Sequence, residues 1–543
     1  MEKNKKIISK NKKKIKKWKK LKKVDWMIYE KNIFKKDFKK INIRFGLCYP
    51  NVYRAAMSSL GYNLLYNLIN EREDTWCERI IYPNIKSLES NTPVNHFDII
   101  SFSLQFEEDY FNVLEILKDT GIPLKREERT ENDPLIIAGG PCATANPMPL
   151  SDYIDIFIIG EGENTINEFL DIYNDFQNTD LKKFLEIDGV YIPEFDNTAR
   201  ISKIENMDDN YHITRPIVTK SDDENFKSVF NNSIMLNVSR GCTRGCRFCM
   251  AGYLYRPVRE TNWKKLVNIA IENRENTDLN KVTLIGAAVS DYKNLDKLIN
   301  GLENEGFQIS TPSLRIESIT KKTLETLKKS GLKTITLAPE SIPRLRKVIN
   351  KDILENKIFT VIKNAVELNF NLKFYFLIGI PGESNDDIKE LCEYMKKIAH
   401  MHNNPKKVKF SINPVIPKPH TPLQWEPYDF KDIKKKTRYI KKEMKNYNIK
   451  CESPKKGLIQ YILSCGNSGI GELIERSLTK QVPLKEWREA TPQYEIDDVL
   501  PWNNIDVGLN EKFLKIENKR LRNLKQTPWC EKSPCYNCGS CEK

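Results

Sequence analysis

Long apolar runs are missing from this 543-residue chain, and their absence limits where the protein can work. No stretch approaches the ~18 consecutive apolar residues that a membrane-spanning helix needs. The N-terminus is a lysine tract without the apolar segment or cleavage site of a signal peptide. With 40% hydrophobic and 30% charged residues, the composition is that of a globular protein, and we expect it to be cytoplasmic and to have no membrane partner.

Excess charge is lacking from most of the chain as well. The net charge is +15, but residues 1–40 hold 18 lysines against four acidic residues, so the other 503 residues carry only about +1. We treat 1–40 as a basic N-terminal arm. It either grips nucleic-acid phosphates, with Trp18 and Trp26 stacking on bases, or it is a solvated tail.

The length favours several domains, and the periodicity of the sequence divides them. In 41–175, apolar strands such as "FDIISFSL" alternate with helices such as "EEDYFNVLEILKDTG", which should end at Gly121. This alternation predicts a Rossmann-like parallel sheet that binds ligands at the carboxyl ends of its strands. Turns that contain glycine follow these strands. Backbone geometry alone can require glycine in a turn, so it is the alternative to a role in ligand binding. Residues 176–230 lose the alternation and are expected to be a connector.

The alternation returns in 231–425. The strands expected there are "SIMLNVSRGC", "KVTLIGAAVS", "SLRIES", "KTITLAPES", "LKFYFLIGIPGES" and "KVKFSINPVIP". Six successive βα units predict an α/β fold with a partial or full (β/α) barrel, whose chemistry gathers on the loops after the strands. Residues 426–543 are expected to be a helical and irregular C-terminal region that is rich in cysteine near its end.

Three cysteines follow the first barrel strand with the spacing C-x3-C-x2-C: Cys242, Cys246 and Cys249. Thirteen cysteines in a cytoplasmic chain are unlike a disulfide framework, and three thiolates in one short loop favour a soft metal. A structural zinc normally has four protein ligands, and no fourth is nearby. A 4Fe–4S cluster held by three cysteines leaves one iron open to a small ligand. Chance clustering, or zinc with a remote fourth ligand, is the alternative.

Together with Phe248, these cysteines resemble the C-x3-C-x-aromatic-C hallmark of the radical S-adenosylmethionine (SAM) superfamily. The resemblance implies a 4Fe–4S cluster whose open iron chelates SAM. An electron then cleaves the sulfonium, and the resulting 5′-deoxyadenosyl radical abstracts hydrogen from the substrate. It also implies an external electron donor of the flavodoxin or ferredoxin type.

The same resemblance assigns SAM contacts in the other barrel loops. The Gly-Gly-Glu-type turn after the second strand is reduced here to "IGAAVSD", where Ser290 or Asp291 would substitute for the glutamate. An ordinary ion pair at the barrel end is the alternative for Arg315 and Glu340. The residues assigned to SAM are Phe248, Gly286, Ser290, Arg315, Glu340, Gly379 and Gly382.

The front domain resembles the cobalamin-binding domain that is fused to many radical SAM enzymes. The Asp-x-His-x-x-Gly motif that supplies a histidine to cobalt is absent, and "YPNVYRAAMSSLGYNLL" stands near its place. The domain therefore either binds cobalamin without this ligand or is a degenerate scaffold. The residues that the resemblance assigns to cobalamin are Gly139, Gly140, Glu161 and Gly162.

A second cysteine group ends the chain with the spacing C-x4-C-x2-C-x2-C: Cys530, Cys535, Cys538 and Cys541. Four thiolates can close a zinc site or hold a second, coordinatively saturated cluster. From about Asn42 to Cys541 the order of motifs resembles one uncharacterised radical SAM family.

Three functions fit these observations. The first is a radical SAM enzyme that modifies a macromolecule, RNA or a ribosomal protein, by methyl or methylthio transfer; the basic arm motivates the macromolecule. The second is a radical SAM enzyme for a small metabolite, and the third is a zinc-dependent nucleic-acid-binding protein. His420, in "PKPHTPLQWEP", has no visible partner and is expected to be structural.

Overall fold

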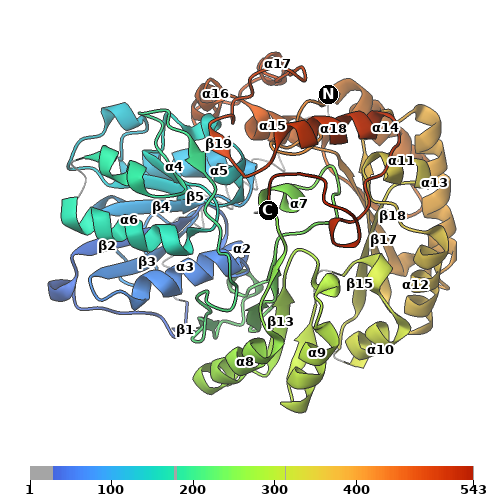
Figure 1. The fold of residues 1–543 in the computed structure, drawn as a ribbon, viewed down its shortest axis with the longest axis horizontal. Helices are drawn as coiled ribbons and strands as arrows, with labels where there is room; N and C mark the ends of the chain where they lie inside the picture. Colours follow the sequence, from blue (N-terminus) through green and yellow to red (C-terminus); the bar gives the residue numbers. More distant parts are fainter. Residues whose placement is uncertain (1–27, 177–179, 312–313, 330, 542–543) are drawn as a thin grey trace, which may run out of the picture.

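A front sheet and a partial barrel, both with flanking helices, lie side by side in the computed structural model, which describes residues 28–176, 180–311, 314–329 and 331–541 (Figure 1). None of the helices in these residues is long and apolar enough to cross a membrane. The basic arm lies mostly outside the described residues.

The front sheet contains five parallel strands in the order β3-β2-β4-β5-β6, and the short β7 pairs antiparallel with β6. Its strands are apolar and almost fully buried, because helices cover both faces of the sheet. As predicted, α4 (Tyr110–Thr120) ends at Gly121, which adopts a left-handed φ of 75°. The strands are β2 (Ile43–Tyr49), β3 (Thr75–Ile81), β4 (Ile99–Ser103), β5 (Leu135–Gly139), β6 (Ile156–Ile158) and β7 (Val190–Tyr191). The other helices are α2 (Tyr53–Ala56), α3 (Leu60–Glu71), α5 (Pro141–Ala145) and α6 (Gly162–Phe176).

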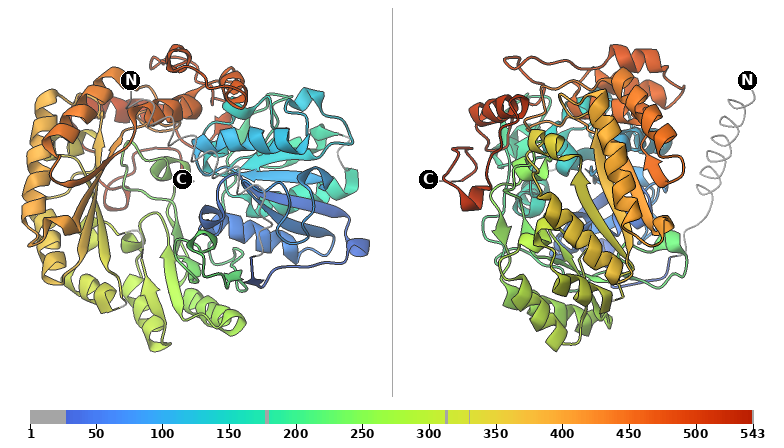
Figure 2. Two further views of the ribbon diagram at one scale, coloured as in Figure 1. Left: turned by 180° about the vertical axis from the view of Figure 1, so that it is seen from behind. Right: turned by 90° about the vertical axis from the view of Figure 1, so that its right-hand side faces the viewer.

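The second unit is a partial (β/α) barrel built from two parallel sheets, of three and four strands. Within the described residues no ladder joins β14 to β15, so the two sheets meet without pairing. Helices line the outside (Figure 2). The strands are β10 (Ile234–Asn237), β13 (Lys281–Ile285) and β14 (Gln308–Ser310), then β15 (Thr334–Glu340), β16 (Asn371–Ile378), β17 (Val408–Pro414) and β18 (Asn448–Cys451). The helices are α8 (Trp263–Thr277), α9 (Leu295–Asn304), α10 (Lys321–Lys329), α11 (Pro343–Val348), α12 (Glu355–Glu367), α13 (Asn385–His400) and α14 (Phe430–Glu443).

Two expectations about the barrel are wrong. The stretch "SLRIES" is not a strand: β14 has already ended at Ser310, and Ile316–Ser318 form a 3₁₀ turn. The Arg315 amide donates to the Ser290 hydroxyl, 3.0 Å away, instead of to a neighbouring strand. The barrel also extends beyond residue 425, because β18 adds a parallel strand to β17.

The connector is not a loose linker. Its residues supply β7 to the front sheet, β8 (Ala199–Arg200), which pairs with β19 (Ile505–Asp506), and β9 (Val218–Thr219), which pairs with β1 (Glu30–Lys31). The predicted connector therefore ties the front domain to both ends of the described chain.

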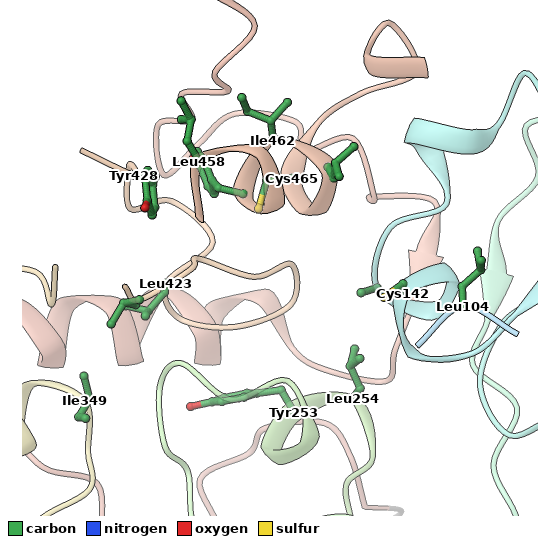
Figure 3. Close-up of a cluster of buried hydrophobic side chains, with 14 of the residues drawn as sticks. Leu104, Cys142, Tyr253, Leu254, Ile349, Leu423, Tyr428, Leu458, Ile462 and Cys465 are labelled. Atoms are coloured by element: carbon green, nitrogen blue, oxygen red, sulfur yellow. The ribbon is translucent and has the colours of Figure 1, made fainter. Parts of the chain in front are cut away.

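One hydrophobic core crosses from the front sheet into the barrel and the C-terminal region. Leu104 and Cys142 of the front domain belong to the same cluster as Tyr253 and Leu254 of α7 (Ala251–Leu254) (Figure 3). Helix α15 (Pro454–Cys465) contributes apolar side chains from above. A large apolar interface of this kind fixes the two units relative to each other. The remaining C-terminal helices are α16 (Ile470–Ser477), α17 (Leu484–Glu489) and α18 (Glu511–Arg522).

The end of the predicted arm is part of the fold. Glu30 is buried and pairs with the fully buried Arg79 at 2.6 Å, and the Tyr53 hydroxyl donates to it at 2.5 Å. The Arg79 guanidinium also pairs with Glu89. Removing Glu30 would leave the buried Arg79 charge only partly compensated, which is strongly destabilising. A truncation that tests the function of the basic N-terminal arm must therefore end before Glu30.

Candidate active site at the cysteine loop

The three-cysteine loop begins where the first barrel strand ends. Strand β10 leads through β11 (Ser239–Arg240) directly into Cys242, and β12 (Arg259–Glu260) closes a hairpin around the loop. Cys246 is buried and the other two thiols are half-buried. Burial raises the pKa of Cys249 to about 11, with Cys246 and Cys242 adding to the shift. Cys249 therefore lies within electrostatic reach of the other two thiols, and its own thiol is protonated near neutral pH.

Two partly buried cations, Arg315 and Lys351, lie beside the loop. Burial alone would lower the pKa of Arg315, but Cys246 and the carboxylates of Glu317 and Asp291 raise it above its ordinary value. Lys351 pairs with Glu340 at 2.6 Å, and its pKa is likewise raised by Glu340 and Cys246 against the effect of burial. Both side chains therefore bring positive charge to the neighbourhood of Cys246. The Arg315 Nε atom is buried without a hydrogen-bond partner in the described part of the chain.

Glu340 has an unusual backbone. Its φ of 66° places a non-glycine residue in the left-handed region, at a register irregularity between β15 and β16. Such a conformation persists only where its surroundings hold it, and here the Lys351 ion pair fixes the side chain. Strained residues of this kind cluster at functional sites.

A cavity of about 430 Å³ next to the loop lies between the front sheet and the barrel. One wall is the carboxyl edge of the front sheet, with Gly139, Gly140 and Gly162; the other includes Arg240 and Gly286. Its volume falls in the usual range of about 300–1,000 Å³ for small-molecule sites. The glycine loops that the sequence analysis assigned to cobalamin and Gly286, which it assigned to SAM, therefore line the same cavity.

Glu161, which also lines this cavity, is already engaged by arginines. Its carboxylate pairs with Arg259 at 2.8 Å and Arg240 at 3.4 Å, and it accepts the Ile204 amide at 2.7 Å. Arg240 also reaches Glu163 at 2.5 Å. This four-residue cluster of Glu161, Glu163, Arg240 and Arg259, hereafter the interdomain clamp, joins the front domain to the cysteine hairpin.

At Gly140 a Cβ would lie 2.8 Å from the Leu104 carbonyl oxygen, and φ is 101°, so backbone geometry alone requires this glycine.

The other predicted SAM residues divide into two groups. The Ser290 hydroxyl is occupied by the Arg315 amide, and its neighbour Asp291 pairs with Arg244 at 2.6 Å. Gly379 and Gly382 line a separate cavity of about 250 Å³ near α14, away from the cysteine loop. Phe248 packs on the main core. The structure therefore gathers Ser290, Arg315 and Glu340 near the cysteines but places the "GIPG" glycines elsewhere.

The tail cysteines fold back against the same loop, as the red C-terminal segment in Figure 1 shows near α7. The Trp529 indole nitrogen donates to the Thr243 hydroxyl at 2.9 Å, and this hydroxyl donates to Glu531 at 3.1 Å. Cys530 lies between these two tail residues, and Thr243 is adjacent to Cys242. Across the described residues, no three Cys, His, Asp or Glu side chains gather closely enough to hold one metal ion.

His420 lies outside this site. It is buried, its ring nitrogen Nε2 is 3.1 Å from the Ala145 carbonyl oxygen, and its ring packs near Trp502. Burial lowers its pKa to about 4. The neutral ring therefore donates a hydrogen bond that links the barrel end to the front domain, in agreement with a structural role.

Comparison with known proteins identifies the family. The model of radical SAM proteins, N-terminal, matches residues 61–193, and that of the radical SAM superfamily matches residues 236–395. Uncharacterized protein MJ0966 of Methanocaldococcus jannaschii is 33% identical over 438 residues, covering 80% of this chain and 90% of the relative. The chain belongs to the radical SAM superfamily.

Two further proteins resemble this radical SAM chain more distantly. Uncharacterized methyltransferase PH0819 of Pyrococcus horikoshii is 23% identical over 321 residues, covering 55% of this chain and 67% of the relative. Among solved structures, the radical SAM methyltransferase TsrM of Kitasatospora setae, with cobalamin and a 4Fe–4S cluster bound, has a TM-score of 0.48 and 11% identity. It covers 68% of this chain and 75% of TsrM. The cofactors of the superfamily are a 4Fe–4S cluster and SAM.

Sequence reasoning assigned Arg315 but missed the other cations around the radical SAM loop. Lys351 carries no motif and became visible only through its contact with Glu340. The arginines did leave a signal, because five of them fall within the 22 residues of "SRGCTRGCRFCMAGYLYRPVRE". They are Arg240, Arg244, Arg247, Arg256 and Arg259.

The pH dependence of stability tests the structural assignment of His420. Its folded-state pKa of about 4 lies below the ordinary value of 6.5. The neutral ring therefore contributes its full stabilisation above about pH 6.5 and loses it as the pH falls toward 4. Between about pH 7 and about pH 4.5, we expect the wild type to lose about 2–3 kcal/mol more unfolding free energy than His420→Gln. Urea unfolding measures this, and equal losses in the two proteins would contradict the assignment.

Proposed function

We propose that this radical SAM enzyme uses Cys242, Cys246 and Cys249 to hold its 4Fe–4S cluster and binds SAM beside them. The observation that carries the proposal is the cysteine loop at the end of the first barrel strand, with the partly buried Arg315 and Lys351 near Cys246. When bound, the cluster supplies the electron for reductive cleavage of SAM. Radical SAM enzymes generally need an external reductant, and we propose a flavodoxin or ferredoxin as the donor.

The residues of the loop fit such a cluster. The donors are three soft thiols, and in a cubane each thiolate binds a different iron, so they need not converge on one point. Ligation requires thiolates, so the raised pKa of Cys249 means that metal binding releases protons. The positive charge of the partly buried Arg315 and Lys351 stabilises thiolates and would also attract the carboxylate of SAM.

The proposed reaction is methyl or methylthio transfer to a macromolecule, RNA or a ribosomal protein. The name of the relative PH0819, a methyltransferase, supports the class of transfer. The basic arm supports a macromolecular substrate, because residues 1–27 alone hold 13 lysines against two acidic residues. A small-metabolite substrate is the second candidate, favoured by the cavity of about 430 Å³ beside the loop.

Cobalamin is a further candidate occupant of this cavity. The cavity lies at the carboxyl ends of the front-sheet strands, where parallel α/β sheets bind their ligands. Leu60, Leu64 and Leu65 of the segment "YPNVYRAAMSSLGYNLL" form part of its wall. This wall offers apolar contact to a corrin and no histidine to its cobalt.

Replacing any one of the three loop cysteines by alanine should abolish SAM cleavage. Loss of one thiolate leaves a second iron without its protein ligand, so the cluster is no longer held in the geometry that the reaction needs. The measurement is 5′-deoxyadenosine formation after anaerobic reconstitution with iron and sulfide, dithionite and SAM. Cys451→Ala, in β18, is the matched control and should retain activity. Formation at the wild-type rate in Cys242→Ala, Cys246→Ala or Cys249→Ala would refute the assignment.

Deleting residues 1–27 distinguishes the two substrate classes. The truncation keeps Glu30 and its ion pair with Arg79, so the fold should survive. For a macromolecular substrate, we expect RNA binding to weaken by at least about tenfold at low salt, with a shallower salt dependence, while substrate-independent SAM cleavage persists. Filter binding at several salt concentrations measures this. RNA binding that does not change on truncation would favour the metabolite.

Absorbance spectroscopy tests cobalamin. Protein reconstituted with hydroxocobalamin and then desalted should keep a corrin band, and Leu64→Trp, which fills the cavity wall, should lose it. An exposed control, Leu354→Trp on the far side of the barrel, should behave as wild type. If the wild type keeps no corrin band after desalting, the front domain is a scaffold.

A further inference from the structure

Arg256, just after α7, is a buried cation without an acidic partner among the described residues. Its side chain is only 3% exposed and its Nη1 atom has no hydrogen-bond partner in that part of the chain. The guanidinium lies near the rings of Tyr253, at 5.2 Å, and Phe513, at 5.6 Å, and Nε donates to the Gly252 carbonyl. A buried charge is costly unless an opposite charge compensates it. The environment of Arg256 is therefore incomplete without an anion.

The groups that face Arg256 from the C-terminal segment are thiols. Its guanidinium interacts electrostatically with Cys530, Cys538 and Cys541 and approaches Cys538 most closely. Cys535 interacts with the same group of sulfurs. The position of Cys538, which is buried, is fixed by its carbonyl oxygen, which accepts the Asn510 amide at 2.7 Å.

Lys203 brings a second cation to the same place. Its ammonium group donates to the carbonyl oxygens of Arg256, at 3.0 Å, and Val507, at 3.2 Å, and it interacts with Cys541. Burial lowers the pKa of Lys203 to about 8. Three tail thiols thus lie within electrostatic reach of one buried guanidinium, with Cys535 beside them, although the four sulfurs of the described tail do not converge on a single point.

We propose that Cys530, Cys535, Cys538 and Cys541 hold a metal centre as four thiolates, and that Arg256 is the residue positioned to compensate its negative charge. Each thiol gives its proton to solvent as its metal–sulfur bond forms. Binding of Zn²⁺ transfers no electron, and a 4Fe–4S cluster takes its Fe²⁺ and Fe³⁺ from iron supplied in both oxidation states, together with sulfide. Four thiolates around one Zn²⁺ carry a net charge of −2, and a 4Fe–4S cluster with four thiolates is also an anion. Both forms supply the charge that Arg256 lacks. The proposal does not depend on the function of the loop cysteines.

The centre would lie directly against the radical SAM loop. Trp529 and Glu531, on either side of Cys530, both contact Thr243, and the Arg244 guanidinium stacks 3.7 Å from the Trp529 ring centre. A single layer of side chains therefore separates Cys530 from the residues next to Cys242. A metal centre at this point would hold the tail on the loop.

Metal analysis of the full-length protein tests the proposal. Wild type, the tail variant Cys535→Ser/Cys538→Ser/Cys541→Ser and the control Cys451→Ser are each reconstituted with iron and sulfide, and separately with Zn²⁺ alone. We expect the tail variant to lose about four irons or about one zinc relative to both other proteins. Circular dichroism confirms that the variant is folded. Loss of iron identifies a cluster and loss of zinc a mononuclear site, whereas unchanged contents of both metals overturn the proposal.

A loop variant keeps this result separate from the proposed enzymatic function. The protein with Cys242, Cys246 and Cys249 all changed to alanine should retain the tail metal. If the tail metal is present but the loop binds none, the enzymatic assignment fails alone. If the loop binds iron but the tail variant loses nothing, the present proposal fails alone.

Arg256→Gln tests the compensating charge. We expect about 10- to 100-fold weaker retention of the tail metal in competition with a chelator, the usual cost of losing a partner of metal ligands. Arg256→Lys should recover part of the loss. Arg274→Gln removes another arginine that stacks on an aromatic ring, 4.5 Å from the Phe307 centre, and should have no effect. Retention in Arg256→Gln equal to that of the wild type would overturn the role of Arg256.

Discussion

The position of the cysteine hairpin depends on the interdomain clamp. A carboxylate as buried as Glu161 is unstable without cations, and the two arginines that compensate it come from the two strands of the hairpin, β11 and β12. Satisfying this one charge therefore fixes the start and the end of the loop against the front domain. The cavity between the two sheets and the thiols beside it consequently belong to one rigid arrangement, which a shared hydrophobic core reinforces.

Other arginines of the hairpin form similar ion pairs and hydrogen bonds with the barrel and the C-terminal region. Arg244 pairs with Asp291 after β13, and the fully buried Arg247 pairs with Glu517 of α18 and donates to the Val348 and Lys525 carbonyl oxygens. The loop forms hydrogen bonds within itself, such as that from the Cys249 amide to the Cys246 carbonyl oxygen at 3.1 Å, and these arginine partners on separate elements hold it from outside as well. Long, always-charged side chains with several donors suit this task, because each can bind more than one acceptor.

Sequence periodicity predicted most of the strands. Each is a local run of apolar residues, as expected for a strand in a sheet that helices cover on both faces. It also placed the three cysteines correctly at the end of a barrel strand. It failed where the structure depends on distant partners: "SLRIES" reads as a strand by composition but forms a turn, and Lys351 reaches Cys246 without any motif. The glycines Gly379 and Gly382 matched a family pattern, yet the cavity that they line lies at α14. The docking of the tail on the loop joins residues nearly 300 positions apart, and no local pattern encodes it.

The partners of Arg247 also impose an order on biosynthesis. The ribosome makes the cysteine loop near the middle of the chain, but Glu517 and the Lys525 carbonyl emerge about 270 residues later. At a translation rate of about 5–20 residues per second, the loop waits roughly 15–50 seconds for its last contacts. During this interval Arg247 lacks the carboxylate and the carbonyl oxygen that it contacts in the mature protein. The loop therefore acquires its full set of outside contacts only after α18 has docked.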